Sequence, residues 1–130
     1  MTIGVPPLAS PCVTEFVAGQ IVLADWRGDG LPPEPDKIRP AVVIEDHELF
    51  GSSYPMIILV PLTSDEGLTN PHLSVIIDPT PENGCPRRCY AVAPFVASTS
   101  AARVRPTRSF ITTDQLTQLR RQVALSIGAA

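Results

Sequence analysis

Two short segments carry side chains that could together hold a phosphate group. Arg39 opens a run rich in Val and Ile that extends to Ile44, and Thr63 and Ser64 close a second such run that begins at Met56. If the two runs form neighbouring antiparallel strands, the start of the first lies beside the end of the second. A planar guanidinium can span two phosphate oxygens, and a hydroxyl beside it can hydrogen-bond the same group. The pattern therefore predicts a phosphate site at one end of a sheet.

A purely structural role would account for the same residues. Arg39 could form an ion pair with a nearby acid such as Glu34 or Asp36, and Thr63 and Ser64 could simply end a strand, where such residues are common. A strand-initial arginine is more often structural than catalytic. The choice between the two roles therefore depends on the motifs around these residues.

The cysteines and histidines are weaker candidates for chemistry. Cys85 and Cys89 are four residues apart, which does not match the usual Cys-x-x-Cys spacing, and Cys12 is the third cysteine. A three-cysteine zinc site is therefore not expected, and free thiols are the default in the cytoplasm. His72, which follows Pro71 at the start of an expected strand, is a candidate general base from its residue type alone.

The composition fits a single folded domain. The chain has 130 residues, of which 44% are hydrophobic, and its 15 prolines favour short strands and many loops. No stretch is apolar over the length that crosses a membrane. Residues 1–14 lack the basic start of a secretory signal and include three prolines. We therefore expect an extended arm at 1–14, one domain at 15–130, and a cytoplasmic protein.

Basic residues are concentrated in the second part of the chain. Through Asp78 there are three basic and eleven acidic residues, and after Asp78 there are seven basic and two acidic residues, so the two parts carry net charges of −8 and +5. Opposite patches could pair within the fold or across a dimer. A basic part equally suits nucleic acid or an acidic partner chain.

Periodicity and turn signals predict six strands separated by loops. The strands are expected at residues 21–26, 39–44, 56–64, 72–78, 88–98 and 107–111. The fifth is expected to be interrupted at Pro94, because proline cannot donate to a strand ladder. A loop rich in Gly and Pro covers 27–36, and 79–84 form a dense turn signal.

The C-terminal segment predicts an amphipathic helix. Thr112 and Gln115 have the spacing of a capping box, and Gly128 provides a stop. One apolar stripe is formed by Leu116, Leu119, Val123 and Ile127. The whole outline indicates a small, strongly curved antiparallel sheet or open barrel closed by a terminal helix.

In this order and spacing, the motifs resemble those of the MazF/PemK toxins of bacterial toxin–antitoxin systems, from about residue 19 to residue 128. The resemblance rests on Gly19-Gln20 before a hydrophobic strand, on Glu34 five residues before the arginine, on Arg39-Pro40-Ala41-Val42-Val43, on Val60-Pro61-Leu62-Thr63-Ser64, and on the closing helix. Each motif is weak alone, and their combination is fairly specific.

The resemblance implies a mainly β fold, an SH3-like antiparallel barrel with a C-terminal helix, which forms homodimers and cleaves single-stranded RNA without a metal or other cofactor. In the family, the Arg of Arg-Pro and the Thr of Pro-x-Thr-Ser carry catalysis, and these positions are Arg39 and Thr63 here. The RNA 2′-hydroxyl attacks its own neighbouring phosphate, which explains action on RNA. A cognate antitoxin with an acidic, partly disordered tail is the expected protein partner, and no membrane partner is expected.

Further residues are expected to bind RNA or support the site. They are Ser64, Glu34, Lys37, Trp26, His72, Arg87 and Arg88. Trp26 borders the long loop and could stack on a base, although a place in the core or a dimer interface also suits it. Arg87 and Arg88 could contact RNA phosphates, or lie on a solvated face or an antitoxin interface.

One stretch departs from the family pattern and keeps alternatives open. Ala93-Pro94-Phe95 occupies the region where many members carry an Asp-Gln pair, so no role is carried over there and no general base is evident. A catalytically silent RNA- or protein-binding barrel fits this departure. A gyrase-binding toxin resembling CcdB shares the fold, but its recognition feature is a C-terminal Trp, whereas the only Trp here is at position 26.

Overall fold

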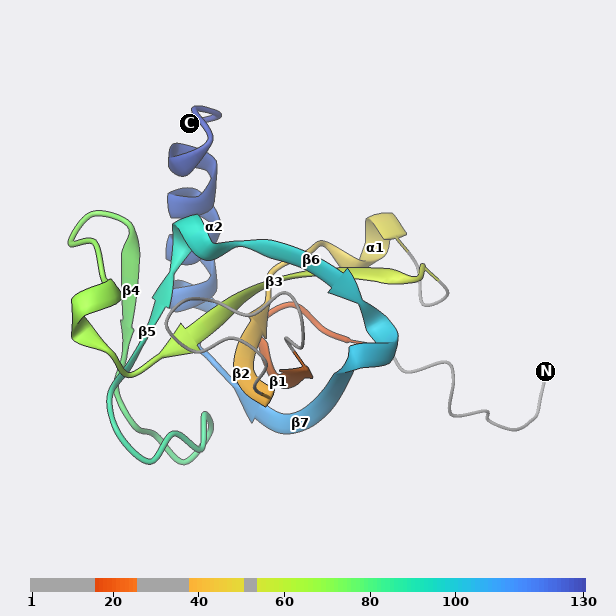
Figure 1. Ribbon diagram of the computed structural model, residues 1–130, viewed down its shortest axis with the longest axis horizontal. Helices are drawn as coiled ribbons and strands as arrows, with labels where there is room; N and C mark the ends of the chain where they lie inside the picture. Colours follow the sequence, from red (N-terminus) through yellow and green to blue (C-terminus); the bar gives the residue numbers. More distant parts are fainter. Residues whose placement is uncertain (1–15, 26–37, 51–53) are drawn as a thin grey trace.

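The computed structural model describes residues 16–25, 38–50 and 54–130. The elements in chain order are β1 (Gln20–Asp25), β2 (Ile38–Val43), α1 (His47–Phe50), β3 (Met56–Thr63), η1 (Glu66–Leu68), β4 (Ser74–Ile77), β5 (Cys89–Val92), η2 (Ala93–Phe95), β6 (Ala97–Ser100), η3 (Ala101–Arg103), β7 (Val104–Phe110) and α2 (Thr113–Ser126) (Figure 1). The expected arm at 1–14 and loop at 27–36 lie outside the described residues.

The strands form one antiparallel sheet in which β3 is central. The order along the sheet is β4-β5-β3-β2-β1-β7, and β6 also pairs with β3. The first half of β3 pairs with β6 and its last two residues pair with β5, with the short 3₁₀ helix η2 between the two partners. Pro94 lies in η2, which confirms the expected interruption. The strands β4 and β7 end the sheet, so it is curved but not closed (Figure 1).

The central strands are buried on both faces, which explains their continuous apolar sequences. In β3, Val60 and Leu62 belong to one apolar cluster, whereas Ile57 and Leu59 belong to a second one. This division follows the two-residue period of a strand, so the clusters lie on opposite faces of the sheet. Leu119 of α2 belongs to the first cluster, so the helix covers that face.

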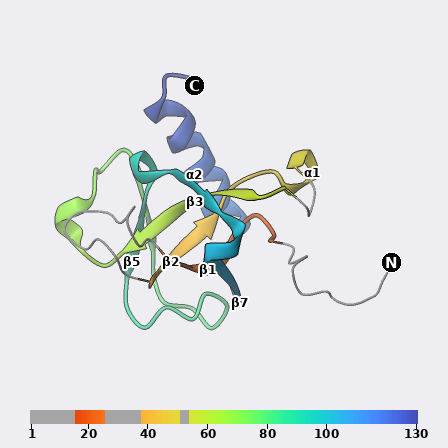
Figure 2. The same cartoon turned by 45° about the vertical axis from the view of Figure 1, so that its right-hand side comes forward.

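The terminal helix begins as the sequence predicts. Thr112 Oγ1 accepts a hydrogen bond from the backbone N–H of Gln115 at 3.0 Å, and Gln115 Oε1 accepts one from the N–H of Thr112 at 2.9 Å. These two bonds are the capping box. The helix follows β7 directly and packs against β4 and η2 (Figure 2). Among the described residues, no helix is long and apolar enough to cross a membrane.

The predicted apolar stripe is wrong at its last position. Leu119 is fully buried, and Leu116 and Val123 are partly buried against the same cluster. Ile127, however, is 71% exposed, because the helix ends at Ser126 and Ile127 is its C-cap residue. The stop at Gly128, whose φ is +77°, is one residue further on.

The last strand is longer than predicted. It was expected at 107–111, after Pro106, but β7 already begins at Val104. Pro106 fits within the strand because β7 pairs only with β1 and is therefore an edge strand, where one side of the backbone needs no ladder donor.

Replacing Leu119 and Ile127 tests which helix residues hold the fold. We expect Leu119→Ala to lower the free energy of unfolding by about 2–5 kcal/mol, because it leaves a cavity in the core. Ile127→Ala should change it by less than about 0.5 kcal/mol, because that side chain is exposed. Urea unfolding followed by circular dichroism measures both. Equal losses from the two substitutions would contradict the assignment of the helix end.

Candidate functional site

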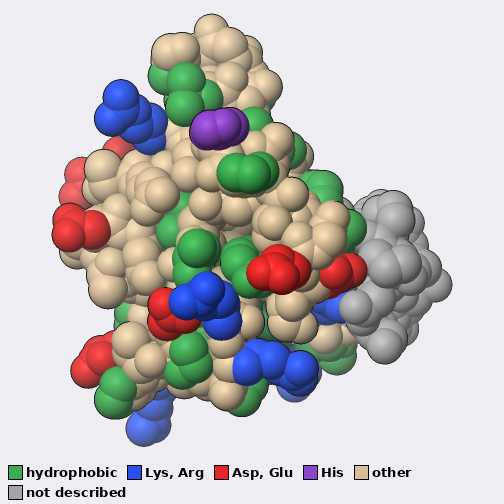
Figure 3. Space-filling model, turned by 90° about the vertical axis from the view of Figure 1, so that its left-hand side faces the viewer, with side chains coloured by type: hydrophobic (Ala, Val, Ile, Leu, Met, Phe, Trp, Pro, Cys, Tyr) green, Lys and Arg blue, Asp and Glu red, His purple; other side chains and the backbone are tan. Residues whose placement is uncertain are grey.

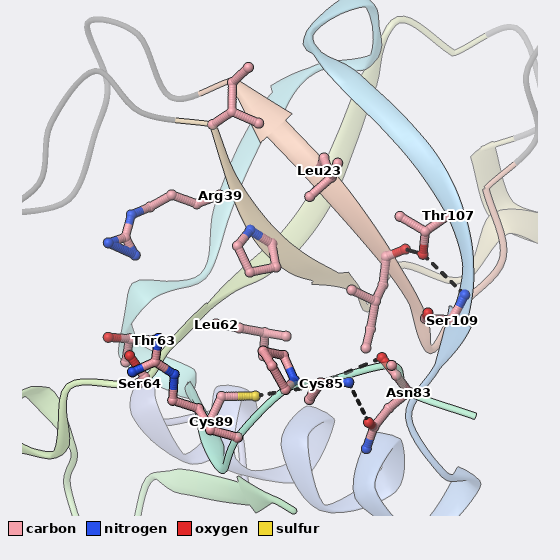
Figure 4. Close-up of a pocket in the computed structure, with 16 residues that line it drawn as sticks. Leu23, Arg39, Leu62, Thr63, Ser64, Asn83, Cys85, Cys89, Thr107 and Ser109 are labelled. Atoms are coloured by element: carbon pink, nitrogen blue, oxygen red, sulfur yellow. Dashed lines mark hydrogen bonds between the residues drawn. The ribbon is translucent and has the colours of Figure 1, made fainter. Parts of the chain in front are cut away.

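The pairing of β2 with β3 brings Arg39 and Thr63 together. Ala41 pairs with Pro61, and the same antiparallel register continued by two residues sets Arg39 opposite Thr63. The start of β2 and the end of β3 thus share one edge of the sheet, as the sequence predicts. Figure 4 shows Arg39, Thr63 and Ser64 on the same side of a cavity.

The cavity has a volume of about 440 Å³ and is assembled from distant parts of the chain. It is lined by Ile21, Leu23, Ile38, Arg39, Pro40, Leu62, Thr63, Ser64, Asn83, Gly84, Cys85, Pro86, Arg87, Cys89, Thr107 and Ser109. These described lining residues include two arginines and no carboxylate. The cavity therefore combines an apolar wall with positive charge, which suits an anion that carries an apolar or aromatic group.

The hydroxyl of Thr63 is held in a defined orientation. Thr63 is buried, with 6% of its surface exposed, and its Oγ1 accepts a hydrogen bond from the backbone N–H of Asp65 at 3.0 Å. The Asp65 carboxylate in turn accepts from the N–H of Gly67 at 2.9 Å, which caps η1. Because one lone pair of the hydroxyl is used in this way, its proton remains available to donate to a ligand. Ser64 is exposed and lines the cavity.

The loop before β5 is built by Asn83. This side chain is only 4% exposed; its amide donates to the carbonyl of Asp78 at 2.8 Å and accepts from the N–H groups of Thr80 at 3.0 Å and Cys85 at 2.9 Å. The N–H of Phe110 donates to the carbonyl of Glu82 at 2.9 Å, which ties the loop to β7. The sequence marked this segment only as a turn.

A close approach to β7 fixes the same loop. Gly84 has a φ of +63°, and a Cβ there would lie 2.9 Å from Ser109 Oγ. The position therefore needs glycine for both its backbone conformation and its space. Through this loop, Arg87 reaches the cavity.

The two neighbouring arginines have different environments. Arg87 lines the cavity, whereas Arg88 is not among the lining residues and forms an ion pair with Asp78. Its Nε lies 2.6 Å from Asp78 Oδ1, and Nη2 lies 3.3 Å from Oδ2. The hydrogen bond and charge of Asp78 raise the pKa of Arg88. Arg88 is thus engaged on the surface rather than in the cavity.

The charge asymmetry of the sequence is partly offset by pairing within the fold. The pair of Arg88 and Asp78 joins the basic and acidic parts of the chain. Arg120 is also used structurally, because it donates to the carbonyl oxygens of Ile44 at 2.8 Å and Glu45 at 3.1 Å. On the face shown in Figure 3, basic, acidic and hydrophobic side chains are interspersed rather than separated.

Of the remaining predicted residues, the structure describes His72 and does not bring it to the cavity. His72 is exposed in the turn before β4 and does not line the cavity. Its backbone N–H donates to Asn70 Oδ1 at 2.9 Å. Trp26, Glu34 and Lys37 lie outside the described residues. The departing stretch Ala93–Phe95 forms η2, which packs against α2 and contributes no lining residue.

Cys85 and Cys89 are cavity residues that the sequence pattern did not identify. Their sulfur atoms are 3.5 Å apart, and both thiols are free. Burial, followed by the hydrogen bond and charge of Cys85, raises the pKa of the Cys89 thiol to about 12. Among the described residues, His, Cys, Asp and Glu side chains form no group of three or more that could hold a metal ion.

The raised pKa of Cys89 predicts slow alkylation in the native state. A thiol reacts as its thiolate, so a pKa of about 12 leaves Cys89 almost fully protonated at pH 9, and its reaction rate should still rise above that pH. Iodoacetamide labelling followed by peptide mass analysis should show that Cys89 reacts faster in denaturant than in the folded protein. Equal rates in the two states would contradict the burial of this thiol.

Three solved structures with the same fold are distant from this chain in sequence. The Mycobacterium tuberculosis toxin MazF-mt6 is 15% identical with a TM-score of 0.64, over 85% of this chain and 98% of that chain. A MazE–MazF structure from Deinococcus radiodurans is 18% identical with a TM-score of 0.61, over 87% and 96%. An endoribonuclease in complex with its cognate antitoxin, from mycobacterial species, is 12% identical with a TM-score of 0.65, over 89% and 98%.

The family itself is identified by the sequence. No curated protein sequence matches the chain significantly. The model of a family described as the PemK-like, MazF-like toxin of type II toxin–antitoxin systems matches residues 18–127, which include every described strand and the whole of the terminal helix. This protein therefore belongs to the PemK-like, MazF-like toxin family of type II toxin–antitoxin systems.

Proposed function

We propose that this protein is a cytoplasmic toxin that cleaves single-stranded RNA at selected sequences without a metal ion. The observation that carries the proposal is that Arg39 and Thr63 line the same cavity, whose wall is partly positive and partly apolar. Family membership supports the same activity. The proposal assigns catalysis to Arg39 and Thr63 and RNA binding to the cavity around them.

The proposed reaction uses the RNA's own 2′-hydroxyl as the nucleophile. The 2′-oxygen loses its proton and attacks the adjacent phosphorus, and the bond from phosphorus to the 5′-oxygen of the next nucleotide breaks. That oxygen takes up a proton, so the products are a 2′,3′-cyclic phosphate and a free 5′-hydroxyl. The reaction requires alignment of the attacking and leaving oxygens and stabilisation of the negative charge on the phosphate.

Arg39 and Thr63 fit these two requirements. The guanidinium of Arg39 can bind two phosphate oxygens and stabilise the charge that grows on them. The hydroxyl of Thr63, oriented by the N–H of Asp65, can donate to the same phosphate. The described lining residues include neither a carboxylate nor an imidazole. The proposed rate enhancement therefore rests on positioning and electrostatics.

The apolar wall favours single strands over duplexes. Leu23, Ile38 and Leu62 line the cavity together with the polar groups, and contact with such side chains requires a base that has left its stack. Bases of single-stranded RNA can be splayed out in this way, whereas those of an A-form helix cannot be reached. The shape of this wall would then decide which sequence is cut.

The proposal includes an antitoxin and a second copy of the chain as protein partners. Two of the similar structures are named as a MazE–MazF structure and as an endoribonuclease in complex with its cognate antitoxin. An acidic antitoxin segment would bind the same arginines as the RNA, so its binding would exclude the substrate. Homodimer formation is proposed from the family resemblance.

Cleavage of a long unstructured RNA in the presence of EDTA tests the proposed catalysis. We expect wild-type protein to give discrete fragments with cyclic-phosphate and 5′-hydroxyl ends. Arg39→Ala should lower the cleavage rate by about 100-fold to 1,000-fold, because it removes the main source of charge stabilisation. Thr63→Val, which keeps the shape of the side chain, should lower the rate more than Thr63→Ser, which keeps the hydroxyl.

Circular dichroism of each variant serves as the folding control for this experiment. Intact RNA after incubation with folded wild-type protein would overturn the enzyme proposal and favour the catalytically silent barrel. Cleavage that Arg39→Ala leaves unchanged would show that the reaction takes place elsewhere on the protein.

The neighbouring residues Arg87 and Arg88 allow a matched test of RNA binding. Arg87→Ala should weaken binding of a non-cleavable 2′-deoxy oligonucleotide and reduce the salt dependence of its Kd by about one phosphate contact, because Arg87 lines the cavity. Arg88→Ala removes the same charge from the next position but should have little effect, because Arg88 is paired with Asp78 outside the cavity. Fluorescence anisotropy at several salt concentrations measures both. Equal losses would place the RNA path over the outer surface of the loop.

A further inference from the structure

Two thiols of the cavity have no role in the proposed reaction. Cys85 and Cys89 both line the cavity, and their sulfur atoms are in contact at 3.5 Å. Both residues are half-buried, so a small reagent that enters the cavity can reach them. Each thiol is free, and together with the three intervening residues they form a short segment that carries Arg87.

We propose that Cys85 and Cys89 form a reversible oxidation site, at which a peroxide joins the two thiols into a disulfide and thereby slows RNA cleavage. Formation of the disulfide is independent of what the cavity binds. Its effect on RNA rests on the proposed function, because it assumes that Arg87 contributes to the RNA site.

The chemistry requires one peroxide for each disulfide. The thiolate of Cys85 attacks one oxygen of hydrogen peroxide, which gives a sulfenic acid on Cys85 and, with one proton, releases water. The sulfur of Cys89 then attacks the Cys85 sulfur, the S–S bond forms, and the hydroxyl leaves as a second water with the Cys89 proton. Burial is the main cause of the raised pKa of Cys89, followed by the hydrogen bond and the charge of Cys85. The charge effect is lost once Cys85 is a neutral sulfenic acid, which favours the second step.

The geometry allows a disulfide between Cys85 and Cys89, and this disulfide would be easy to reduce. A disulfide has its sulfur atoms about 2.05 Å apart, so the two sulfurs must approach each other by about 1.5 Å. The ring would enclose only three residues, one of them Pro86, so it restricts the unfolded chain very little and gains little stability. Weakly stabilised disulfides of this kind are the labile, regulatory ones, and they suit a compartment that keeps thiols reduced.

The backbone is held at Cys85 and at Cys89, so we expect disulfide formation to displace Arg87, which lies between them. The N–H of Cys85 is held by Asn83 Oδ1 at 2.9 Å, and Cys89 is paired with Ile77 in the sheet. With both ends held, we infer that closing the sulfur atoms strains the three residues between them and displaces Arg87. A displacement of about 1 Å in a positioning group can cost up to about 100-fold in rate. We therefore expect the oxidised protein to cleave RNA more slowly than the reduced protein.

The experiment uses the full chain with Cys12→Ser, so that Cys85 and Cys89 are its only thiols. The reduced protein is treated with hydrogen peroxide, and part of it is then treated with dithiothreitol. Intact mass and thiol titration are measured at each stage, followed by RNA cleavage in EDTA. The matched control carries Cys85→Ser and Cys89→Ser in addition and is compared with its own rate before peroxide.

We expect oxidation to remove the mass of two hydrogen atoms and both titratable thiols from a single chain. Cleavage should fall roughly tenfold or more and recover with dithiothreitol, while the control keeps its starting rate. Persisting thiols, or a disulfide between two chains, would overturn the proposal. So would a disulfide that leaves cleavage unchanged, or an equal loss of activity in the control.

Failure of the proposed function has a different signature. If the reduced protein cleaves no RNA, the enzyme proposal fails, while mass and thiol titration still decide whether the disulfide forms. If the control variant does not fold, recovery of RNA cleavage with dithiothreitol shows whether a disulfide caused the loss of activity. Dithiothreitol reduces a disulfide but does not reverse oxidation of methionine.

Discussion

The antiparallel register between β2 and β3 is the constraint on which the proposed site depends. The register in which Ala41 pairs with Pro61, extended by two residues, sets Arg39 opposite Thr63, and a slip of one residue would turn every side chain of one strand to the other face. Both strands are packed on both faces, so such a slip would disturb two apolar clusters at once. The packing that stabilises the sheet therefore also fixes which backbone positions of the two strands meet at the cavity.

Features that depend on neighbouring residues could be predicted from the sequence. The Val- and Ile-rich runs indicated the central strands, Pro94 marked the break between β5 and β6, and Thr112 with Gln115 marked the start of α2. Arg39 and Thr63 could be brought together as well, because an antiparallel pair of adjacent runs leaves little freedom in how their ends meet.

Features that depend on distant segments could not be predicted in this way. Arg87 and Arg88 are equivalent in the sequence, and only the position of Asp78 assigns one of them to the surface. Cys85 and Cys89 had an unremarkable spacing, yet the bond from Cys85 to Asn83 and the pairing of Cys89 with Ile77 place both on the cavity. Ile127 fitted the helical period, but a period does not show where a helix ends.

The participation of β7 has a consequence for when the cavity is completed during synthesis of the chain. This edge strand supplies Thr107 and Ser109 to the cavity wall and is tied back to the first strand, where Gln20 Nε2 donates to the carbonyl of Thr107 at 2.9 Å. Translation proceeds from the N-terminus, so Arg39 and Thr63 leave the ribosome well before the strand that completes their surroundings. A nascent chain therefore lacks the complete cavity until this last strand has folded onto β1.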